Sequence, residues 1–389
     1  MKLKEAAVLV LKGLRFGSPP RSDLVVYDQE GSDRLVMTAL KGLEFAILPT
    51  RRERFYLSLP IAARMLKNLF RLEGLSFSQL FRIYLLSCVE HMRPKAVVTY
   101  IDNDVFFHKL SRDCPRAAFI AVQNGVKTPE SMTSPSRHPL GWLPEPPAWG
   151  SKISMPELFC FGRHEEEIYK RYGHEVDRFH PVGSLVGGYY KSEVSDGSGR
   201  IDYDVLLVSQ WREAIMTGQT FPYLKKGLDI LHDFLGRRRK KHPLRFALAL
   251  CSKDPAERDY FESVFGKDVL VVPFDREGLS TYVAMDRAKV VASLSSAAAY
   301  EAVGWGKKVF FCNFTGTPAR DCPKTGFWSV ESPDYPLFES KLDHLLAMDQ
   351  GEFEKLTDET RRYLMNFDPR RPAHRIIRER LLECLGARS

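Results

Sequence analysis

The sequence lacks the patterns typical of disulfide-bonded, zinc-binding and membrane-spanning proteins. Its seven cysteines are an odd number, no two of them are separated by two residues, and no group of Cys and His has the spacing of a zinc site. We therefore expect free thiols, mostly buried, as in a reducing cytoplasm. No run of about 18 apolar residues occurs, so no segment is predicted to span a bilayer.

The glycine-rich fingerprint of dinucleotide-binding enzymes is also absent. No G-x-G-x-x-G motif follows a predicted strand, which argues against binding of NAD or FAD. We expect no resident cofactor.

The chain is long enough for two domains of ordinary size. It has 389 residues, of which 44% are hydrophobic and 27% are charged, a composition typical of globular proteins. The net charge of +8 favours phosphates, acidic sugars or an anionic membrane surface as partners. The densest basic run, at 237–241, is typical of a solvated helix end, where cations face the negative pole of the helix dipole.

Short apolar strands alternate with helical patterns along the chain. In the first half, strands are predicted at 23–28, 44–50, 95–102, 117–123 and 157–162, and helices at about 60–72 and 76–93. In the second half, strands are predicted at 203–210, 244–251, 268–274, 289–294 and 307–313, and helices at 222–240, 255–265, 279–286 and 296–304. Near-continuous Val, Ile and Leu runs indicate strands buried on both faces, and hence parallel sheets covered by helices.

Two segments interrupt this alternation. Residues 186–202 are rich in Gly, Ser and Asp, so we place the linker between the two halves there. Residues 126–156 are rich in proline and show little periodicity, which predicts a long loop of the functional or disordered kind.

The strongest candidate for a ligand site lies at 289–313. A predicted buried strand ends at Ser295 and Ser296, and a helix with small residues in its first turns begins there. Hydroxyls and free backbone N–H groups at a helix N-terminus can bind phosphate, although a single Ser in this position is commonly a plain helix cap. Glu301 lies one turn further along, where its carboxylate could reach a ribose hydroxyl.

A second candidate is the pair Asp102 and Asp104, which follows the predicted strand 95–102. Ligands of open α/β sheets bind at this end of the strands, so Asp102 could serve as a general base or a nucleophile. Either Asp104 or Asn103 is also expected to cap the following helix. A D-x-D metal site is an alternative, but such a site belongs to a one-domain fold that would leave the second set of strands unexplained.

Two further strand ends carry polar groups. Gln123 and Asn124 follow the strand 117–123, where their amides could bind sugar hydroxyls or simply form an Asn-Gly turn. Ser209 and Arg212 follow the first strand of the second half, and Lys253 follows the next one. We expect these cations to meet phosphate or a donor carboxylate, with a solvated surface cation as the alternative.

Taken together, these motifs resemble those of glycosyltransferases of the GT-B fold. The segment 289–313 is similar to their donor-nucleotide segment and to the Ser-Ser motif of transferases that use CMP-sugars. Tyr-Ile-Asp-Asn at 100–103 and Gln-Asn-Gly at 123–125 resemble transferases of surface-carbohydrate and O-antigen synthesis. The pair His180–Pro181 is similar to that of CMP-sialic acid and Kdo transferases, but here it precedes the predicted linker.

The resemblance implies an α/β protein with two Rossmann-like domains whose parallel sheets face each other across a cleft. Residues 1–190 would form the acceptor domain and residues 200–350 the nucleotide-sugar domain, with helices of 351–389 packing back toward the first domain. It assigns catalysis to Asp102 and Asp104, acceptor binding to Gln123 and Asn124, and no metal. The donor nucleotide would be bound by Ser295, Ser296, Glu301, Arg212, Ser209 and Lys253.

The implied activity is transfer of a sugar from a CMP-, UDP- or GDP-linked donor to a glycan or lipid-linked glycan of O-antigen, lipopolysaccharide or capsule. The enzyme would be cytoplasmic or peripheral at the inner face of an anionic membrane, without a nucleic-acid partner. Three alternatives remain: a UDP-sugar 2-epimerase, a glycerophosphotransferase using CDP-glycerol, and a non-catalytic binding protein of the same fold.

Overall fold

The computed structural model describes residues 13–28, 31–50, 55–71, 77–127, 154–275 and 278–386. The chain forms two compact units, each described here by itself. The first unit comprises Met1–Phe161, Glu165–Val186 and Arg370–Ser389, and the second comprises Gly162–His164 and Gly187–Pro369. Most of the predicted loop 126–156 lies outside the described residues, but its last residues already belong to a strand.

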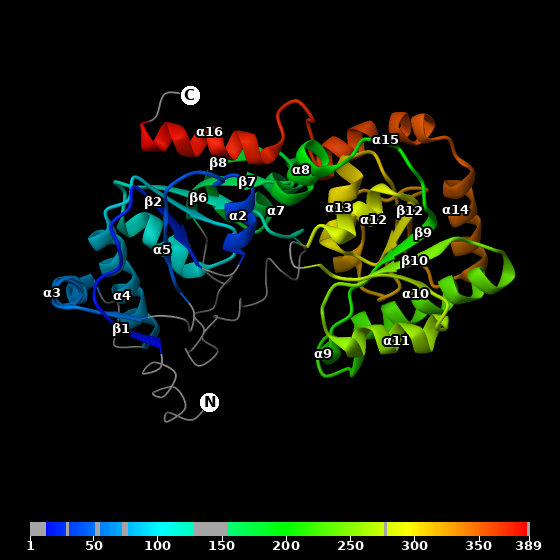
Figure 1. The fold of residues 1–389 in the computed structure, drawn as a ribbon, viewed down its shortest axis with the longest axis horizontal. Helices are drawn as coiled ribbons and strands as arrows, with labels where there is room; N and C mark the ends of the chain where they lie inside the picture. Colours follow the sequence, from blue (N-terminus) through cyan, green and yellow to red (C-terminus); the bar gives the residue numbers. More distant parts are fainter. Residues whose placement is uncertain are drawn as a thin grey trace. The chain divides into compact units, whose positions relative to one another are not determined.

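The first unit contains a six-stranded parallel sheet (Figure 1). Its order is β3 (Ala46–Leu48), β2 (Leu24–Tyr27), β5 (Ala96–Thr99), β6 (Ala118–Val122), β7 (Ser154–Cys160) and β8 (Glu175–Pro181). The order of the strands reverses between β2 and β5. In open α/β sheets such a switch point marks the place where ligands bind, outside the carboxyl ends of the strands.

Helices cover both faces of this sheet, as the near-continuous apolar strands predict. One face packs on α4 (Phe77–Met92), α5 (Val105–Asp113) and α7 (Arg163–Arg171). The other packs on α2 (Ser32–Met37) and α16 (Ala373–Leu385). The last helix of the chain therefore completes the core of the first unit.

A smaller substructure flanks this sheet. Two short parallel strands, β1 (Leu14–Phe16) and β4 (Phe55–Leu57), form a sheet of their own. Helix α3 (Leu59–Asn68) follows β4 and ends in a 3-10 turn at Leu69–Arg71. Ser58 caps α3 by accepting a hydrogen bond from the backbone N–H of Ile61.

The second unit contains another six-stranded parallel sheet. Its order is β11 (Leu270–Val272), β10 (Phe246–Ala249), β9 (Tyr203–Val208), β12 (Ala288–Ser293), β13 (Lys308–Cys312) and β14 (Ser329–Val330). Numbered along the chain, this is the Rossmann order 3-2-1-4-5-6, with its switch point between β9 and β12. The predicted α/β fold with two parallel sheets is thus confirmed.

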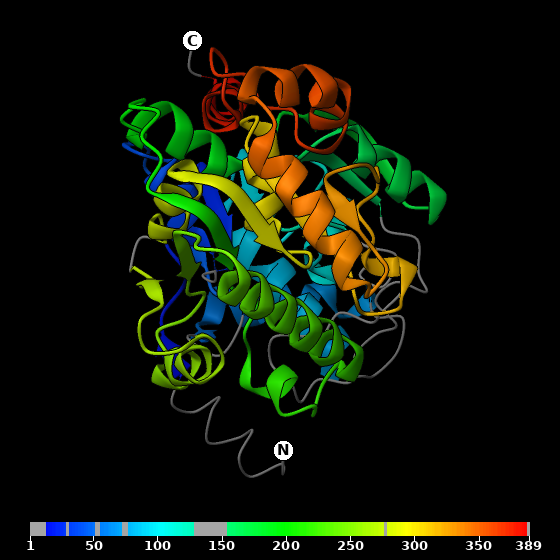
Figure 2. The same ribbon diagram turned by 90° about the vertical axis from the view of Figure 1, so that its right-hand side faces the viewer.

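Two adjacent side chains of β13 show that helices cover both faces of the second sheet. Phe310 packs on Phe338, with ring centroids 5.3 Å apart, whereas Phe311 packs on Tyr300 at 4.4 Å. Helices α10 (Pro222–Lys241), α11 (Pro255–Phe265) and α14 (Tyr335–Ala347) share the first of these faces (Figure 2). Helix α13 (Ala297–Gly304) lies on the other, together with α12 (Ser280–Asp286), and α15 (Gln350–Leu364) packs against α13.

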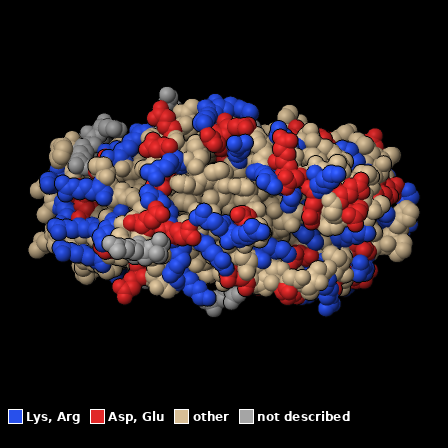
Figure 3. Space-filling view, turned by 90° about the horizontal axis from the view of Figure 1, so that it is seen from above, with Lys and Arg blue, Asp and Glu red and all other residues tan. Residues whose placement is uncertain are grey.

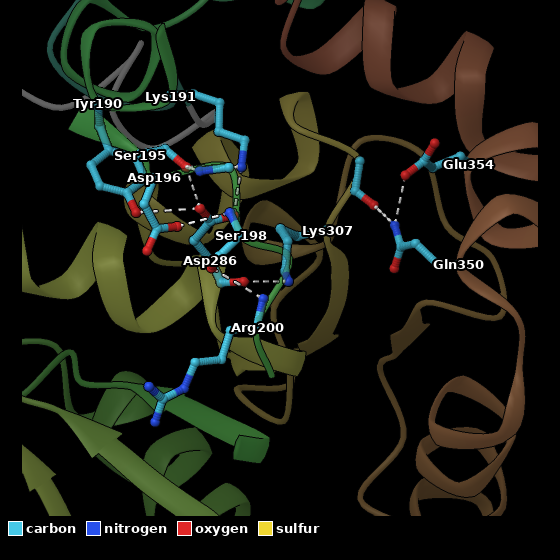
Figure 4. A network of polar contacts seen from close by, with 12 residues as sticks. Tyr190, Lys191, Ser195, Asp196, Ser198, Arg200, Asp286, Lys307, Gln350 and Glu354 are labelled. Atoms are coloured by element: carbon cyan, nitrogen blue, oxygen red, sulfur yellow. Dashed lines mark hydrogen bonds and ion pairs between the residues drawn. The ribbon is translucent and has the colours of Figure 1, made fainter. Parts of the chain in front are cut away.

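The segment predicted as a linker is partly helical. It begins with α8 (Leu185–Tyr189) and a π-helical turn (Tyr190–Val194), followed by an irregular stretch. Asp286 at the end of α12 anchors it, because its carboxylate accepts hydrogen bonds from Lys191 Nζ at 2.6 Å and Ser195 Oγ at 2.6 Å (Figure 4). Lys307 donates to the backbone carbonyl of Asp286, and burial lowers the pKa of this lysine to about 8.

The basic run at 237–241 ends α10, as predicted, and its cations are mostly ion-paired within the second unit. Arg238 contacts Asp343 at 2.7 Å and Lys241 contacts Glu339 at 2.7 Å. On the face shown in Figure 3, acidic and basic side chains are interspersed, with basic ones dense over the first unit. No helix among the described residues is both long enough and apolar enough to cross a membrane.

Candidate functional site

In the second unit, the side chain of Gln210 joins the loops that follow β9 and β12. Its Oε1 accepts hydrogen bonds from Ser293 Oγ at 3.2 Å and from the backbone N–H of Ser295 at 2.9 Å. Its Nε2 donates to Ser295 Oγ at 3.4 Å. These loops lie at the switch point of the sheet, so the segment 206–213, which ends the first strand of the second half and carries Ser209 and Arg212, meets the predicted site at 289–313 where a ligand is expected.

Helix α13 begins at this switch point. Ser296 is its N-cap residue, and its side chain makes no capping hydrogen bond. The backbone N–H of Ser296 is instead held by Ser293 Oγ at 3.0 Å. The first helical residues, Ala297 and Ala298, are only half-buried and have small side chains, so the positive end of α13 is accessible to an anion.

A buried carboxylate that the sequence analysis missed fixes the neighbouring loops. Glu257 on α11 is fully buried, and its Oε1 accepts from the hydroxyl of Ser209 at 2.5 Å. The same carboxylate accepts from the backbone N–H groups of Cys251 and Ser252 at 3.0 and 2.9 Å. Its position three residues after Asp254, the N-cap of α11, is the signal that could have identified it, because Glu at this position commonly bonds to backbone N–H groups before the helix.

The sequence predicts that Ser209 binds the donor nucleotide, but in the structure its hydroxyl is bonded to groups of the protein itself. The side chain is buried, and its Oγ also accepts from the backbone N–H of Trp211 at 3.1 Å. Because both contacts lie within the protein, the hydroxyl holds the loop after β9 in shape. Its predicted contact to a nucleotide would have to compete with these bonds.

Arg212 and Lys253 are exposed cations on the loops after the adjacent strands β9 and β10. Neither makes an ion pair within the part of the chain that the structure describes. Both lie at the carboxyl ends of these strands, close in sequence to Ser209 and Ser252, which Glu257 holds.

Glu301 lies in α13, one turn beyond the N-terminus. Its side chain is buried and Oε2 accepts a hydrogen bond from the hydroxyl of Tyr282 at 2.9 Å. The close approach of α8 depends on a glycine, because a Cβ on Gly187 would lie 2.8 Å from the same oxygen. The carboxylate is consequently fixed in orientation before any ligand binds.

In the first unit, the structure brings two predicted motifs together through an ion pair. Asp102 follows β5 and is fully buried, and its Oδ2 lies 2.6 Å from Nζ of Lys127, which is 6% exposed. Tyr169 donates a hydrogen bond to the same oxygen at 3.3 Å. Asp102 Oδ1 has no hydrogen-bond partner among the described residues.

Lys127 was not singled out from the sequence, although it lies only two residues after Gly125 of the Gln123-Asn124-Gly125 segment. The ring of His108 supports the Asp102 loop, because its Nε2 lies 2.9 Å from the backbone carbonyl oxygen of Asp102. Burial lowers the pKa of His108 to about 3, so this ring is neutral at physiological pH.

Asp104 is the N-cap residue of α5, which is the alternative role that the sequence predicts for it. Its Oδ1 accepts from the backbone N–H groups of Phe106 and Phe107 at 2.8 and 3.1 Å and from the hydroxyl of Tyr27 at 3.1 Å. Burial raises the pKa of Asp104 to about 6, against the opposing effect of these hydrogen bonds. It links β2 and β5, the two strands at the switch point of the first sheet.

Gln123 and Asn124 differ in accessibility. Gln123 is buried, and its amide donates to Glu165 Oε1 at 2.9 Å while accepting from the backbone N–H of Phe161 at 2.8 Å. Asn124 is half-buried. The amide of Gln123 thus joins β6 to the end of β7, and only Asn124 keeps a side chain that solvent reaches.

His180 is bound by a carboxylate of the adjacent strand. Its Nε2 lies 3.2 Å from Glu157 Oε2, and its ring stacks on Phe159 with centroids 4.3 Å apart. Arg380 of α16 contacts the same carboxylate. His180 therefore belongs to the docking site of the last helix. No group of three or more His, Cys, Asp or Glu residues suited to a metal ion occurs among the described residues.

Comparison with known proteins identifies the fold. No family model matches the chain, and no curated protein matches it in sequence. Among solved structures, the Staphylococcus aureus protein MnaA with UDP is similar, with a TM-score of 0.53 and 13% identity over 93% of this chain and 97% of that one. A UDP-N-acetylglucosamine 2-epimerase has a TM-score of 0.53 and 15% identity over 95% and 98%.

A glycosyltransferase from Rickettsia africae is similar over 94% of this chain and 99% of its own, with a TM-score of 0.51 and 12% identity. At such identities the likeness concerns the fold alone. The agreement extends over nearly the whole of each chain, and so covers both Rossmann-like units. The chain therefore has the GT-B-type fold that MnaA, this 2-epimerase and this glycosyltransferase share.

Proposed function

We propose that the protein is a metal-independent glycosyltransferase that uses a nucleotide-sugar donor, bound at the carboxyl ends of β9, β10 and β12. The observation that carries this proposal is the clamp formed by Gln210. It fixes the loops after β9 and β12 so that the uncapped N-terminus of α13 is presented at the switch point. Such an arrangement binds the phosphates of nucleotides in α/β proteins.

The charges around the clamp suit a diphosphate. The helix N-terminus carries a partial positive charge, and Arg212 and Lys253 add two full charges on the adjoining loops. When the bond between the sugar and the diphosphate breaks, negative charge grows on the leaving oxygen. Fixed positive groups stabilise that charge without a metal ion. Glu301, held by Tyr282, is proposed to bind the ribose.

We assign the acceptor to the first unit and the catalytic carboxylate to Asp102. In the transfer step the acceptor hydroxyl attacks the anomeric carbon, its proton passes to a base, and the nucleotide leaves with the bonding electrons. Asp102 Oδ1 is the oxygen of this carboxylate that is not engaged by Lys127 or Tyr169. Asn124 is proposed to contact acceptor hydroxyls, whereas Asp104, Ser209 and Gln123 are proposed to act by holding the loops.

A glycan or lipid-linked glycan of a surface polysaccharide, such as O-antigen or capsule, is the proposed acceptor. Its support is the resemblance of the Tyr-Ile-Asp-Asn and Gln-Asn-Gly segments to transferases of that pathway. Binding of UDP to MnaA, a protein of similar fold, favours a UDP-linked donor over CMP- or GDP-linked ones.

The donor site is tested by binding of UDP, CDP, CMP and GDP to the purified protein, measured by calorimetry and by the shift in melting temperature. A ligand that binds only the folded state raises that temperature. We expect one nucleotide to bind, and the double variant Arg212→Ala, Lys253→Ala to bind it at least about tenfold more weakly, since two charge-assisted contacts are lost.

The matched control replaces Lys226 and Lys240, two exposed lysines of α10, with alanine. This control should bind the nucleotide as the wild type does. Absence of binding by any nucleotide to a folded protein would contradict the proposal and favour a non-catalytic binding protein. Preference for CDP would favour transfer of a glycerophosphate group.

A UDP-sugar 2-epimerase is the second candidate, favoured by the fold shared with MnaA and with a 2-epimerase. The two activities differ in their need for an acceptor. Incubation of the protein with UDP-N-acetylglucosamine alone, followed by NMR of the sugar, separates them. Inversion at the sugar C2 without release of UDP would identify an epimerase and exclude the transferase assignment.

A further inference from the structure

Helix α3 of the first unit presents an apolar stripe to solvent. Leu59, Ala63 and Leu66 recur at spacings of four and three and therefore share one side of the helix. Leu59 is 87% exposed and Leu66 is 72% exposed, whereas Ile61 and Asn68 on the opposite side are buried. A surface helix of a globular protein normally has the reverse pattern, with its apolar stripe turned to the core.

The stripe continues on the elements that flank α3. In the β1–β4 ladder, Phe16 pairs with Leu57, and both are exposed, at 86% and 50%. Ser18 and Ser58 join the ends of these strands through a hydrogen bond of 2.7 Å, directly before α3. We call this surface the α3 face; its exposed apolar residues are Phe16, Leu57, Leu59, Leu66, Leu69 and Phe70.

A hollow of about 970 Å³ borders the α3 face. Its lining includes the four cations Arg64, Lys67, Arg93 and Arg116. Its two acids already have partners: Glu90 accepts from Asn68 at 2.9 Å, and Asp113 lies 3.7 Å from Arg82. The four lining cations make no ion pair with a carboxylate within the described part of the chain.

The neighbouring His91 reports the same excess of positive charge. Its pKa lies below the usual range, first because of desolvation and then because of the charges of Arg64, Arg21 and Arg93. The hollow is thus a positive site beside an exposed apolar stripe. Exposed apolar groups at this density mark a contact surface rather than a chance feature.

We propose that the α3 face docks on the surface of an anionic lipid bilayer. Leu59, Leu66 and their apolar neighbours would enter the interface between headgroups and acyl chains, while the cations of the hollow bind lipid phosphates. A second copy of this chain is a poorer partner, because pairing two identical faces would bring both sets of cations together. This inference concerns where the protein works and does not depend on its donor or reaction.

The test is co-sedimentation of the full chain with vesicles of phosphatidylcholine alone or mixed with phosphatidylglycerol. We expect binding to the mixed vesicles, little binding to phosphatidylcholine, and weaker binding at high salt. Two variants should each reduce binding by about tenfold or more: Leu59→Ser with Leu66→Ser, and Lys67→Glu with Arg93→Glu and Arg116→Glu.

The control variants make the same kinds of substitution, Leu to Ser and a basic residue to Glu, at exposed positions of the second unit. Leu337 and Leu356 are exposed leucines, and Lys226, Lys240 and Lys355 are exposed lysines. Their Ser and Glu variants should bind vesicles like the wild type, and circular dichroism confirms that every variant is folded. Equal losses in the controls, or no binding to phosphatidylglycerol vesicles, would overturn the proposal. So would a dimer in solution that Leu59→Ser with Leu66→Ser converts to a monomer.

Discussion

The buried ion pair of Asp102 and Lys127 in the first unit has two candidate roles, catalysis and stabilisation of the fold, which experiments must distinguish. A buried pair of opposite charges loses much of its attraction to desolvation, so stability alone is a weak reason for its presence. Removing one partner, however, leaves an uncompensated charge in the interior. Loss of activity after a single substitution therefore does not show whether catalysis or folding has been impaired.

A pair of substitutions resolves this at the residue scale. Asp102→Asn leaves Lys127 buried without its partner and should lower the free energy of unfolding by about 3–5 kcal/mol. Lys127→Met added to it removes the stranded charge and should restore most of that loss. If Asp102 is the catalytic carboxylate, the double variant will be stable but at least about a hundredfold slower in donor turnover.

Chemical denaturation and turnover of the nucleotide sugar are the two measurements. A double variant with wild-type turnover would show that Asp102 serves only the fold. A stable double variant that binds the nucleotide normally yet fails to turn it over would support the catalytic assignment.

The sequence could indicate the site residues only by their position at strand ends. That rule correctly located Ser295, Ser296, Arg212 and Lys253 on loops at one edge of the second sheet. It could not distinguish a hydroxyl or amide facing solvent from one turned inward. The partners of Ser209 and Gln123 are Glu257 and Glu165, which lie 48 and 42 residues away in the chain, and no local pattern announces such pairs.

At the scale of elements, two glycines of α10 should respond oppositely to the same substitution. A Cβ on Gly227 would lie 2.9 Å from Leu294 Cδ1 and 3.0 Å from the backbone nitrogen of Thr315, so α10 would have to move. Gly227→Ala should destabilise the protein by about 1–3 kcal/mol. Because Leu294 precedes Ser295 in the proposed donor site, nucleotide affinity should fall as well.

Gly236 on the same helix is the matched control. A Cβ there meets no atom within 4 Å, so Gly236→Ala should stabilise the protein by about 0.5–1 kcal/mol through better helix propensity. Thermal unfolding of both variants measures the difference. Similar melting temperatures for the two would show that the close packing of α10 against the loop after β12 is not required.

The regular elements were predicted from sequence where burial made the pattern simple. Strands covered on both faces are short runs of Val, Ile, Leu and Ala, and β5, β9 and β12 were located within a few residues. Strand β8 escaped notice because it is a polar edge strand with the sequence EVDRFHP. Helix α3 was predicted, but its outward apolar face was not, because periodicity shows that a face exists without showing which way it points.

At the scale of the whole chain, helices that follow one another in the sequence belong to different units. Helices α14 and α15 belong to the second unit, whereas α16 belongs to the first. The apolar residues Ala373, Ile377 and Leu381 of α16 are buried in the core of the first unit. The order of the strands in each sheet could not be predicted from the sequence either, because parallel strands that pair with each other are far apart in the chain. The similarity of the α/β patterns in the two halves predicted two units. The expectation that helices of 351–389 pack toward the first domain came only from the resemblance to GT-B glycosyltransferases, and in the structure α16 belongs to the first unit whereas α15 does not.

The attachment of α16 should depend on pH through Glu157. Arg380 donates to Glu157 Oε2 from Nε at 2.9 Å and to Oε1 from Nη2 at 2.5 Å, and His180 and Arg178 also contact this carboxylate. Although burial alone would raise the pKa of Glu157, these partners lower it to about 2. A carboxylate with a lowered pKa stabilises the fold fully above its unfolded pKa, and the stabilisation disappears as the pH falls through the folded pKa.

Arg380→Gln should therefore destabilise the first unit by about 2 kcal/mol at pH 7, a figure reduced for the partial exposure of the arginine. The difference from the wild type should shrink as the pH falls from about 4.5 toward 2, because Glu157 takes up a proton over this range. Denaturation at several pH values measures that difference, and hydrogen exchange shows where it acts. Faster exchange should appear in β7 and β8 and leave β9 and β12 unchanged. Faster exchange in both units would instead mean that α16 stabilises the two as one cooperative structure.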